Sequence, residues 1–310
     1  MTLPEETVHL SFEPGPYRMA MALVAQDPAE MIELDAHYPA EMAERRRLLG
    51  VRHRDVFATL PGSEAARREV LDRLSVLLPA RFPAWFTRDG DMLHNRLTDE
   101  SWDIAAPTLD PLEVAGRLVQ EDLCVLRLTP EGPILDAAVL CFPSRWSLAE
   151  KLGQPLAMIH TRVPFYGERL ARPVDRLMEN LRAGKMVVRL NWGMTDDPAL
   201  FAESRKFRRE HNPDVTAENA GEKLWLRVER QTLSQLPASG AVLFTIRTHL
   251  YTVARLAAQP AVAADLAAAV RALPEQMTLY KSIPPFRAAL LAYLDARAGT
   301  RQEETAHADH

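Results

Sequence analysis

The chain has 310 residues, of which 47% are hydrophobic and 25% are charged. This length and composition are typical of a soluble globular protein that folds as one large domain or two small ones. The net charge of −5 argues against a nucleic-acid-binding surface, which would need a clustered excess of Lys and Arg. The expected partners are therefore small molecules or other proteins.

The first residues, "MTLPEETVHLSFEPGPYRM", carry acidic residues and prolines where a secretory signal needs a basic region followed by an apolar one. No later apolar run reaches the ~18 residues of a membrane helix. We therefore expect a cytoplasmic protein without a membrane segment. Cys124 and Cys141 lie in apolar stretches, which favours buried free thiols over a disulfide. Two thiols also cannot supply the four ligands of a common iron–sulfur cluster.

The first third of the chain is expected to form scaffold helices. Residues 39–49, "PAEMAERRRLL", predict a short helix with one apolar side. Residues 64–78 place five apolar side chains at helical spacing, which predicts an amphipathic helix. Residues 110–120 begin with Asp110 as the N-cap and a proline in the first turn.

Strand signals dominate the middle of the chain. "LCVLRLT" and "LDAAVLCF", joined by "PEGP", predict a hairpin over 123–129 and 135–142. Further strands are predicted at 185–194, 223–237 and 240–251, and helices at 147–153, 169–183 and 261–273. The short connections favour a mostly antiparallel sheet with helices, so the predicted fold class is α+β.

Two polar stretches are set apart from this pattern. Residues 196–222 are expected to form an exposed insertion with one or two helical turns. Residues 298–310 have few apolar side chains and predict a disordered tail. No composition shift divides the remainder, so residues 1–297 are expected to form a single domain.

Common catalytic signatures are missing from the sequence. It contains no GxGxxG, Walker A, HExxH, CxxC or GxSxG pattern, so dinucleotide, P-loop, zincin, thioredoxin and α/β-hydrolase functions have no support. Charged residues within the predicted strands are the remaining signal. Buried without partners they would cost several kcal/mol each, so they face water, pair with one another or line a cavity.

Period-two alternation groups these strand residues by face. Arg227 and Glu229 share one face of their strand, and Arg230 lies on the other. Arg189 and Asn191 likewise share a face of the strand at 185–194. In the last strand, Arg247 and His249 share a face. A solvated sheet face with ion pairs explains this pattern as well as a polar cavity does.

His160, in "MIHTRVPFY", is either a packed or surface residue or a ligand of an iron ion. A lone histidine beside apolar residues is most often a packed or surface residue, and no second histidine stands at the spacing of a zinc site. Haem, however, needs only one axial imidazole from a protein. His249 is the second candidate ligand, and Cys141 ranks last because burial keeps a thiol protonated. His94 is expected to line the pocket or to cap a turn.

Three sequence blocks, in the same order and with similar spacing, resemble the α subunit of haem-dependent oxidative N-demethylase. They are "WSLAEKLGQPLAMIHTRVPFY", "RLNW" and "LWLRVERQTLSQLPASGAVLFTIRTHLY". Weaker similarity in "ELDAHYPAEMAERRRLL" extends the resemblance to most of residues 12–297.

The resemblance implies a PAS-like fold around a haem pocket. The expected fold is a curved antiparallel sheet with flanking helices, its core spanning roughly 85–255, preceded by an N-terminal helical extension. It also implies b-type haem with His160 as the iron ligand. The implied reaction is monooxygenase-type oxidation of a small secondary amine such as dimethylamine with O₂. Electrons would come from NADPH through a partner carrying FMN and a 2Fe–2S cluster, and a further subunit would bind tetrahydrofolate.

The same resemblance suggests roles for the charged strand residues. Arg227, Glu229 and Arg230 are the candidates for catalysis, because oxygen activation needs a positive donor and amine binding needs a carboxylate. Arg189, Asn191 and Arg247 are candidates for holding the haem propionates, since guanidinium binds carboxylates bidentately. A non-catalytic haem sensor and a haem-free structural module are the alternative functions, because a shared fold does not by itself transfer an activity.

Overall fold

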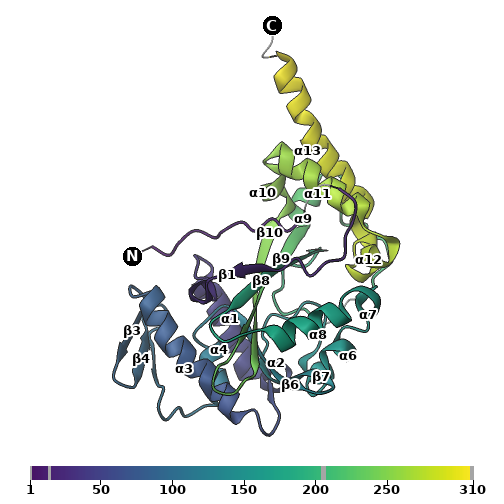
Figure 1. The fold of residues 1–310 in the computed structure, drawn as a ribbon. Coiled ribbons are helices and arrows are strands. Elements are labelled where there is room, and N and C mark those ends of the chain that lie inside the picture. Colours follow the sequence, from purple (N-terminus) through teal and green to yellow (C-terminus); the bar gives the residue numbers. More distant parts are fainter. Residues whose placement is uncertain (1, 13–14, 204–206, 308–310) are drawn as a thin grey trace.

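One large antiparallel sheet forms the centre of the protein (Figure 1). In the computed structural model, which describes residues 2–12, 15–203 and 207–307, seven strands follow the order β1-β8-β9-β10-β6-β7-β2. They are β1 (Val24–Gln26), β2 (Phe57–Thr59), β6 (Asp122–Thr129), β7 (Gly132–Val139), β8 (Met186–Thr195), β9 (Trp225–Gln235) and β10 (Val242–Thr252). Each neighbouring pair is antiparallel. The predicted α+β class and the predominance of antiparallel pairing are therefore confirmed.

The predicted central strands are all present. β6 and β7 form the expected hairpin, with a register shift between Val125 and Leu126. β8, β9 and β10 correspond to the strands predicted from alternation and from β-branched content. β9 and β10 pair along their whole length, from Trp225 opposite Thr252 to Gln235 opposite Val242. This long pairing determines which side chains of the two strands share a face.

Short helices between β7 and β8 cover one face of the sheet. They are α5 (Leu148–Lys151), α6 (Leu156–Ile159), α7 (Tyr166–Arg169) and α8 (Ala171–Asn180). Their apolar residues pack against the sheet in a cluster that includes Leu126, Leu135, Met178 and Ile246. The helix predicted at 169–183 corresponds to α8, which begins at Ala171 and ends at Asn180. This layer and the sheet beneath it enclose the cavity described below.

The N-terminal third packs on the opposite face of the sheet. It contains η1 (Pro28–Glu30), α1 (Tyr38–Val51), α2 (His53–Val56), α3 (Glu64–Arg81), α4 (Pro111–Gly116) and a small sheet of β3 (Phe86–Asp89), β4 (Met92–Asn95) and β5 (Glu100–Asp103). The helices predicted at 39–49 and 64–78 are confirmed. The Asp110 side chain accepts a hydrogen bond from the Leu112 amide, as an N-cap does. α4 is nevertheless shorter than predicted and ends at Gly116, where an added Cβ would lie 2.5 Å from the Val139 side chain.

The C-terminal helices cover the far end of the long strands. They are α9 (Ala220–Lys223), α10 (Val253–Ala257), α11 (Pro260–Ala272), α12 (Glu275–Tyr280), η2 (Pro284–Phe286) and α13 (Arg287–His307). α11 confirms the helix predicted at 261–273. α13 extends into residues 298–310, for which a disordered tail was expected, because its Ala, Arg, Gln and Glu residues favour helix. Residues 308–310 lie outside the described residues.

The insertion at 196–222 is mostly irregular, as expected, and its helical part is the start of α9. Asp196 accepts hydrogen bonds from Arg208 and Asn212, 2.7 Å each, which tie two parts of the insertion together. Residues 204–206 of this stretch lie outside the described residues.

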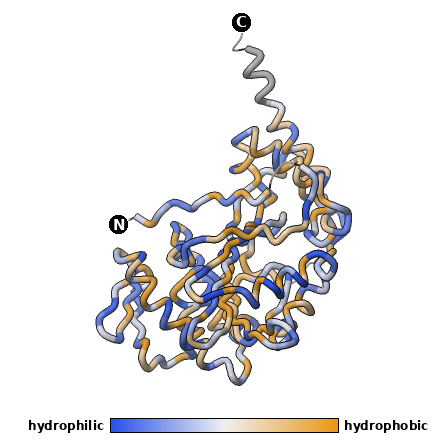
Figure 2. Tube along the Cα trace, viewed as in Figure 1, coloured by the Kyte–Doolittle hydropathy of each residue, from blue (hydrophilic) through white to orange (hydrophobic). Residues whose placement is uncertain are grey.

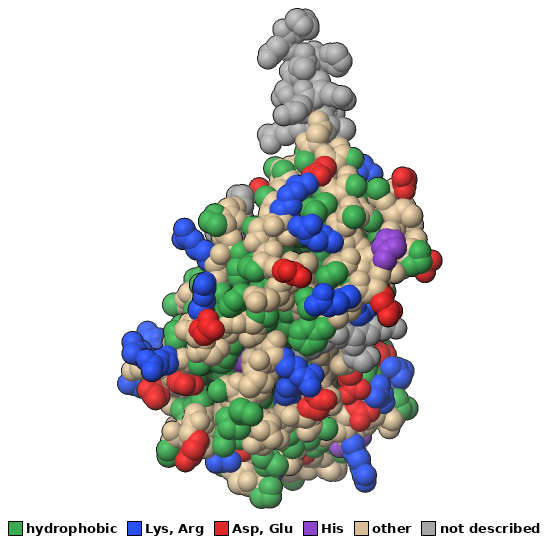
Figure 3. Space-filling model, turned by 90° about the vertical axis from the view of Figure 1, so that its right-hand side faces the viewer, with side chains coloured by type: hydrophobic (Ala, Val, Ile, Leu, Met, Phe, Trp, Pro, Cys, Tyr) green, Lys and Arg blue, Asp and Glu red, His purple; other side chains and the backbone are tan. Residues whose placement is uncertain are grey.

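Hydrophobic residues lie mainly around the central sheet, and hydrophilic residues lie mainly in the outer parts of the chain (Figure 2). Figure 2 shows hydrophobic positions along the strands and the helices that touch them, and hydrophilic positions in the outer loops. On the face shown in Figure 3, basic and acidic side chains are intermixed. Among the described residues, every helix is too short or too polar to cross a bilayer.

Candidate functional site

A cavity of about 400 Å³ lies between the sheet and the helices that connect β7 to β8. This volume is in the range of small-molecule and cofactor sites. Its apolar wall includes Leu126, Leu135, Leu156, Ile159, Phe244 and Ile246, and the N-terminal segment contributes residues 17–23. The remaining wall is the charged face of β8 and β9. The cavity therefore combines apolar walls with a polar floor.

The register of β8 and β9 assembles this polar floor. Arg189 lies opposite Gln231, and Asn191 lies opposite Glu229. The Glu229 Oε2 atom accepts hydrogen bonds from Asn191 Nδ2 at 3.3 Å and from Gln231 Nε2 at 2.8 Å. Two neutral amides thus orient one carboxylate, and the four side chains all line the cavity.

The two arginines of the floor differ in what they bind. The terminal nitrogens of Arg227 donate to the Phe142 carbonyl at 2.6 Å and the Leu200 carbonyl at 3.2 Å, so this side chain ties the strand to neighbouring loops. Arg189 is partly buried, and its buried Nε atom has no hydrogen-bond partner among the described residues. Burial lowers the pKa of Arg189, although Glu229 acts in the opposite direction. An incompletely satisfied guanidinium in a cavity is suited to binding an anionic group.

Two further cations on the cavity wall were not predicted from the sequence. Arg145 donates to the carbonyls of Lys281 and Met194 at 2.7 and 2.6 Å. Burial, reinforced by Arg227, lowers the pKa of Arg145 to about 10. The ammonium of Lys281 donates to the Trp192 carbonyl and lies 4.7 Å from the centre of the Trp192 ring. Neither residue belongs to an alternating strand pattern, so the sequence carried no signal for them.

Wild-type protein is expected to gain stability relative to the Lys281→Met variant as pH rises from 8 to 10.5. Burial, with Arg145 and Arg189 nearby, lowers the pKa of Lys281 from 10.5 to about 8. In this window the unfolded lysine still binds a proton that the folded side chain has lost, so the free energy of unfolding increases with pH. The difference in the free energy of unfolding between wild type and the variant should change by about 3 kcal/mol over this pH range. Urea unfolding at several pH values measures it, and a difference that stays constant up to pH 10.5 would contradict the shift.

His160 lies on the cavity wall directly after α6. Its Nδ1 atom is 2.8 Å from the Leu156 carbonyl oxygen, and its ring stacks on Tyr166 with centroids 4.5 Å apart. Because a carbonyl only accepts, Nδ1 must be the donor, and the neutral ring then has its lone pair on Nε2. Metal-binding imidazoles commonly have this type of hydrogen bond, which fixes the tautomer and the ring orientation.

Arg230 and Arg247 lie on the opposite face of the sheet. They face each other across β9 and β10, one position out of phase with the cavity-lining residues. Arg230 Nε is 3.2 Å from Glu33, and Arg247 pairs with Asp35 at 2.6 Å and Glu41 at 2.7 Å. The structure thus brings His160, Arg189, Asn191, Arg227 and Glu229 to one cavity and does not bring Arg230 or Arg247 there.

The remaining sequence candidates also lie away from the polar floor. His249 is on the same face as Arg247. His94 lies on β4 in the small sheet and contacts Ser101 at 2.7 Å. Cys124 and Cys141 are buried free thiols, as predicted. Burial raises the pKa of Cys141 to about 12, so its thiol is protonated near neutral pH.

One comparison with known proteins bears on this cavity. The family model described as haem-dependent oxidative N-demethylase, alpha subunit-like, matches residues 22–291. The match contains all the strands of the large sheet and both the helical and the charged walls of the cavity. It confirms the resemblance inferred from the three sequence blocks.

Proposed function

Because this chain belongs to the haem-dependent oxidative N-demethylase alpha subunit-like family, we propose that its cavity binds haem b and oxidises a small secondary amine. The family description implies haem and oxidative demethylation. Dimethylamine as the substrate class, and the assignment of individual residues, are our proposals. The observation that carries them is one oriented imidazole on an apolar wall, within a cavity whose floor holds a fixed carboxylate.

The residues that line the cavity fit a haem group. Haem needs one protein imidazole, apolar walls for the porphyrin and cations for two propionates. His160 supplies the imidazole, and leucine and isoleucine side chains supply the walls. Arg189, whose buried Nε has no hydrogen-bond partner among the described residues, is the proposed propionate-binding residue. Asn191, the other candidate on this strand, is not assigned to the propionates because its amide donates to Glu229.

The proposed mechanism assigns each side chain one task. Bound haem supplies the oxygen-binding and electron-transfer chemistry. His160 would hold the iron through Nε2, and the Leu156 carbonyl fixes the orientation of the ring. Glu229 pairs with the ammonium form of the amine, since a carboxylate held in place by two amides needs little further ordering. The apolar wall excludes water from the site.

The proposed reaction requires electrons that this chain cannot relay. Cys124 and Cys141 are both buried, and two thiols do not build an iron–sulfur cluster. We therefore propose a reductase partner that carries FMN and a 2Fe–2S cluster and takes electrons from NADPH. A tetrahydrofolate-binding subunit is the proposed acceptor of the formaldehyde product. We also propose that residues 1–297 form one domain with a PAS-like core over roughly 85–255, which contains β6–β10 and the helices α5–α8.

Two measurements on the purified protein test the proposal in sequence. Hemin titration followed by absorption should give one bound haem per chain and a Soret band. The haem-loaded protein, with NADPH, a reductase and dimethylamine, should then release formaldehyde. A protein that stays colourless with excess hemin contradicts haem binding. A haem-loaded protein that oxidises no amine contradicts the catalytic proposal and favours the gas-sensing alternative.

A further inference from the structure

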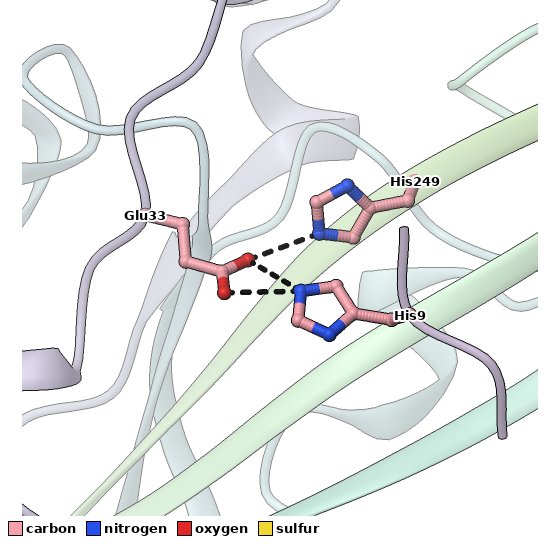
Figure 4. Close-up of side chains that lie close together, drawn as sticks. All are labelled: His9, Glu33 and His249. Carbon is pink, nitrogen blue, oxygen red and sulfur yellow. Dashed lines mark hydrogen bonds and ion pairs between the residues drawn. The ribbon is translucent and has the colours of Figure 1, made fainter. Parts of the chain in front are cut away.

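Three polar side chains converge on the sheet face opposite the cavity: His9, Glu33 and His249 (Figure 4). They come from the N-terminal segment, the loop before α1 and strand β10. His9 Nε2 is 3.0 and 3.2 Å from the two Glu33 oxygens, and His249 Nε2 is 3.1 Å from Glu33 Oε2. His249 is 2% exposed. His9 lies 24 positions before Glu33 in the sequence, and His249 lies 216 positions after it. The fold therefore brings two ring nitrogens to one carboxylate.

The position of His249 requires a positive charge. Its Nδ1 is 3.1 Å from Glu6 Oε1, and its Nε2 is 3.1 Å from Glu33 Oε2. Both neighbouring atoms are carboxylate oxygens, but a neutral imidazole donates only one hydrogen. Arg230 pairs with Glu33 and Arg255 pairs with Glu6, which keeps both carboxylates ionised. Either the ring is doubly protonated, or a cation lies between Nε2 and Glu33. In the second case Nδ1 donates to Glu6, which is the outer carboxylate contact typical of metal-binding histidines.

The separations of the three ligand atoms suit one metal ion. Nitrogen and oxygen atoms that each lie about 2.1 Å from a tetrahedral ion are about 3.4 Å apart. The nitrogen-to-oxygen distances of 3.0–3.2 Å at Glu33 are close to this value. The donor atoms of all three residues lie within 4.8 Å of one another. Small side-chain movements are therefore enough to accommodate an ion.

The charge around the cluster also favours a cation. Among the described residues, five carboxylates and three guanidiniums connect to it: Glu6, Glu33, Asp35, Glu41 and Glu121, against Arg230, Arg247 and Arg255. Glu121 is fully buried, and its Oε2 has no hydrogen-bond partner among the described residues. A divalent ion would neutralise this excess of negative charge.

We propose that His9, Glu33 and His249 bind a divalent transition-metal ion of the zinc class, with Glu6 supporting His249. Two imidazoles and a carboxylate select zinc-like ions over Mg²⁺ and Ca²⁺, which prefer oxygen ligands. The site lies on the other face of the sheet from the cavity and stands whether or not the cavity binds haem.

The ion would anchor the N-terminal segment to the sheet. Other contacts also hold this segment. The Tyr251 hydroxyl accepts from the His9 amide at 3.1 Å and donates to the Thr7 carbonyl at 2.9 Å, and Glu6 pairs with His249 and Arg255. Residues 17–23, farther along the same segment, form part of the cavity wall. Binding at His9 is therefore expected to protect both parts of the segment from amide hydrogen exchange.

Calorimetric titration of chelator-treated, tag-free protein with ZnCl₂ tests the proposal. We expect one ion per chain, a rise in Tm and no comparable binding of MgCl₂. His9→Ala and His249→Ala should each weaken zinc binding at least 100-fold, and Glu6→Gln should weaken it about 10-fold. His9→Ala changes a residue at the edge of the fold, so it remains informative if His249→Ala does not fold.

His94→Ala is the matched control, because it removes a histidine that lies on the small sheet and outside the cluster. It should bind zinc as wild type does. Zinc binding of equal affinity in His9→Ala and wild type, or the absence of zinc binding in wild type, would overturn the proposal. The second result would mean that His249 is the doubly protonated partner of Glu6 and Glu33.

Discussion

Replacing His160 with alanine is expected to abolish stoichiometric haem binding. The imidazole is the proposed iron ligand, and its ring is already held by Leu156 and stacked on Tyr166. Removing it leaves the apolar wall without a ligand to iron. Hemin titration followed at the Soret band should show tight one-to-one binding in wild type and only weak, spectrally different binding in the variant. Formaldehyde release should fall to background.

The matched control is His249→Ala, which removes a buried histidine from the opposite face of the sheet. It should retain the wild-type Soret band, provided that circular dichroism shows it folded. Added imidazole should partly restore the spectrum of His160→Ala by occupying the space that the side chain leaves. Haem binding with an unchanged spectrum in His160→Ala would refute the assignment of the ligand.

Replacing Glu229 with glutamine is expected to lower kcat/KM for dimethylamine by about 10- to 100-fold. This factor corresponds to the loss of one hydrogen bond to a charged group, which contributes about 1.5–3 kcal/mol. The substitution preserves side-chain size and removes the negative charge that pairs with the ammonium. Asn191 and Gln231, which now donate to the carboxylate, would face a neutral amide. Steady-state formaldehyde production at equal haem loading measures the effect.

Glu168→Gln provides the comparison, because it neutralises an exposed carboxylate on α7 that does not line the cavity. Its kinetics should match those of wild type. The haem content of Glu229→Gln should also be unchanged, since His160 and Arg189 carry that interaction. An unaltered kcat/KM in Glu229→Gln would mean that the amine binds elsewhere in the cavity.

The division of the strand residues between two faces followed from the sequence alone. Strand side chains alternate with a period of two, so Arg227 and Glu229 had to share a face from which Arg230 is excluded. The strands themselves were recognisable from their β-branched and aromatic residues. His160 also emerged as the first candidate ligand, ahead of His249, from its local sequence and from the family resemblance.

Only the tertiary structure decided which face of the sheet borders the cavity. Alternation places Arg247 and His249 together, but it carries no information about what covers them. The helices α5–α8 and Glu229 line the same cavity, whereas Asp35, before α1, pairs with Arg247. Both faces of the long strands carry charge, and so the two environments were indistinguishable before the layers were assembled.

Residues far apart in the sequence were the least predictable part. Lys281 reaches the cavity from the end of α12, and His9 meets His249 although 239 residues separate them in the sequence. Such contacts depend on how separate elements pack, not on any local period. The sequence by itself determined the strands, their alternation and the candidate histidine. The cavity, its additional cations and the His9–Glu33–His249 cluster exist only because long-range packing brings those elements together.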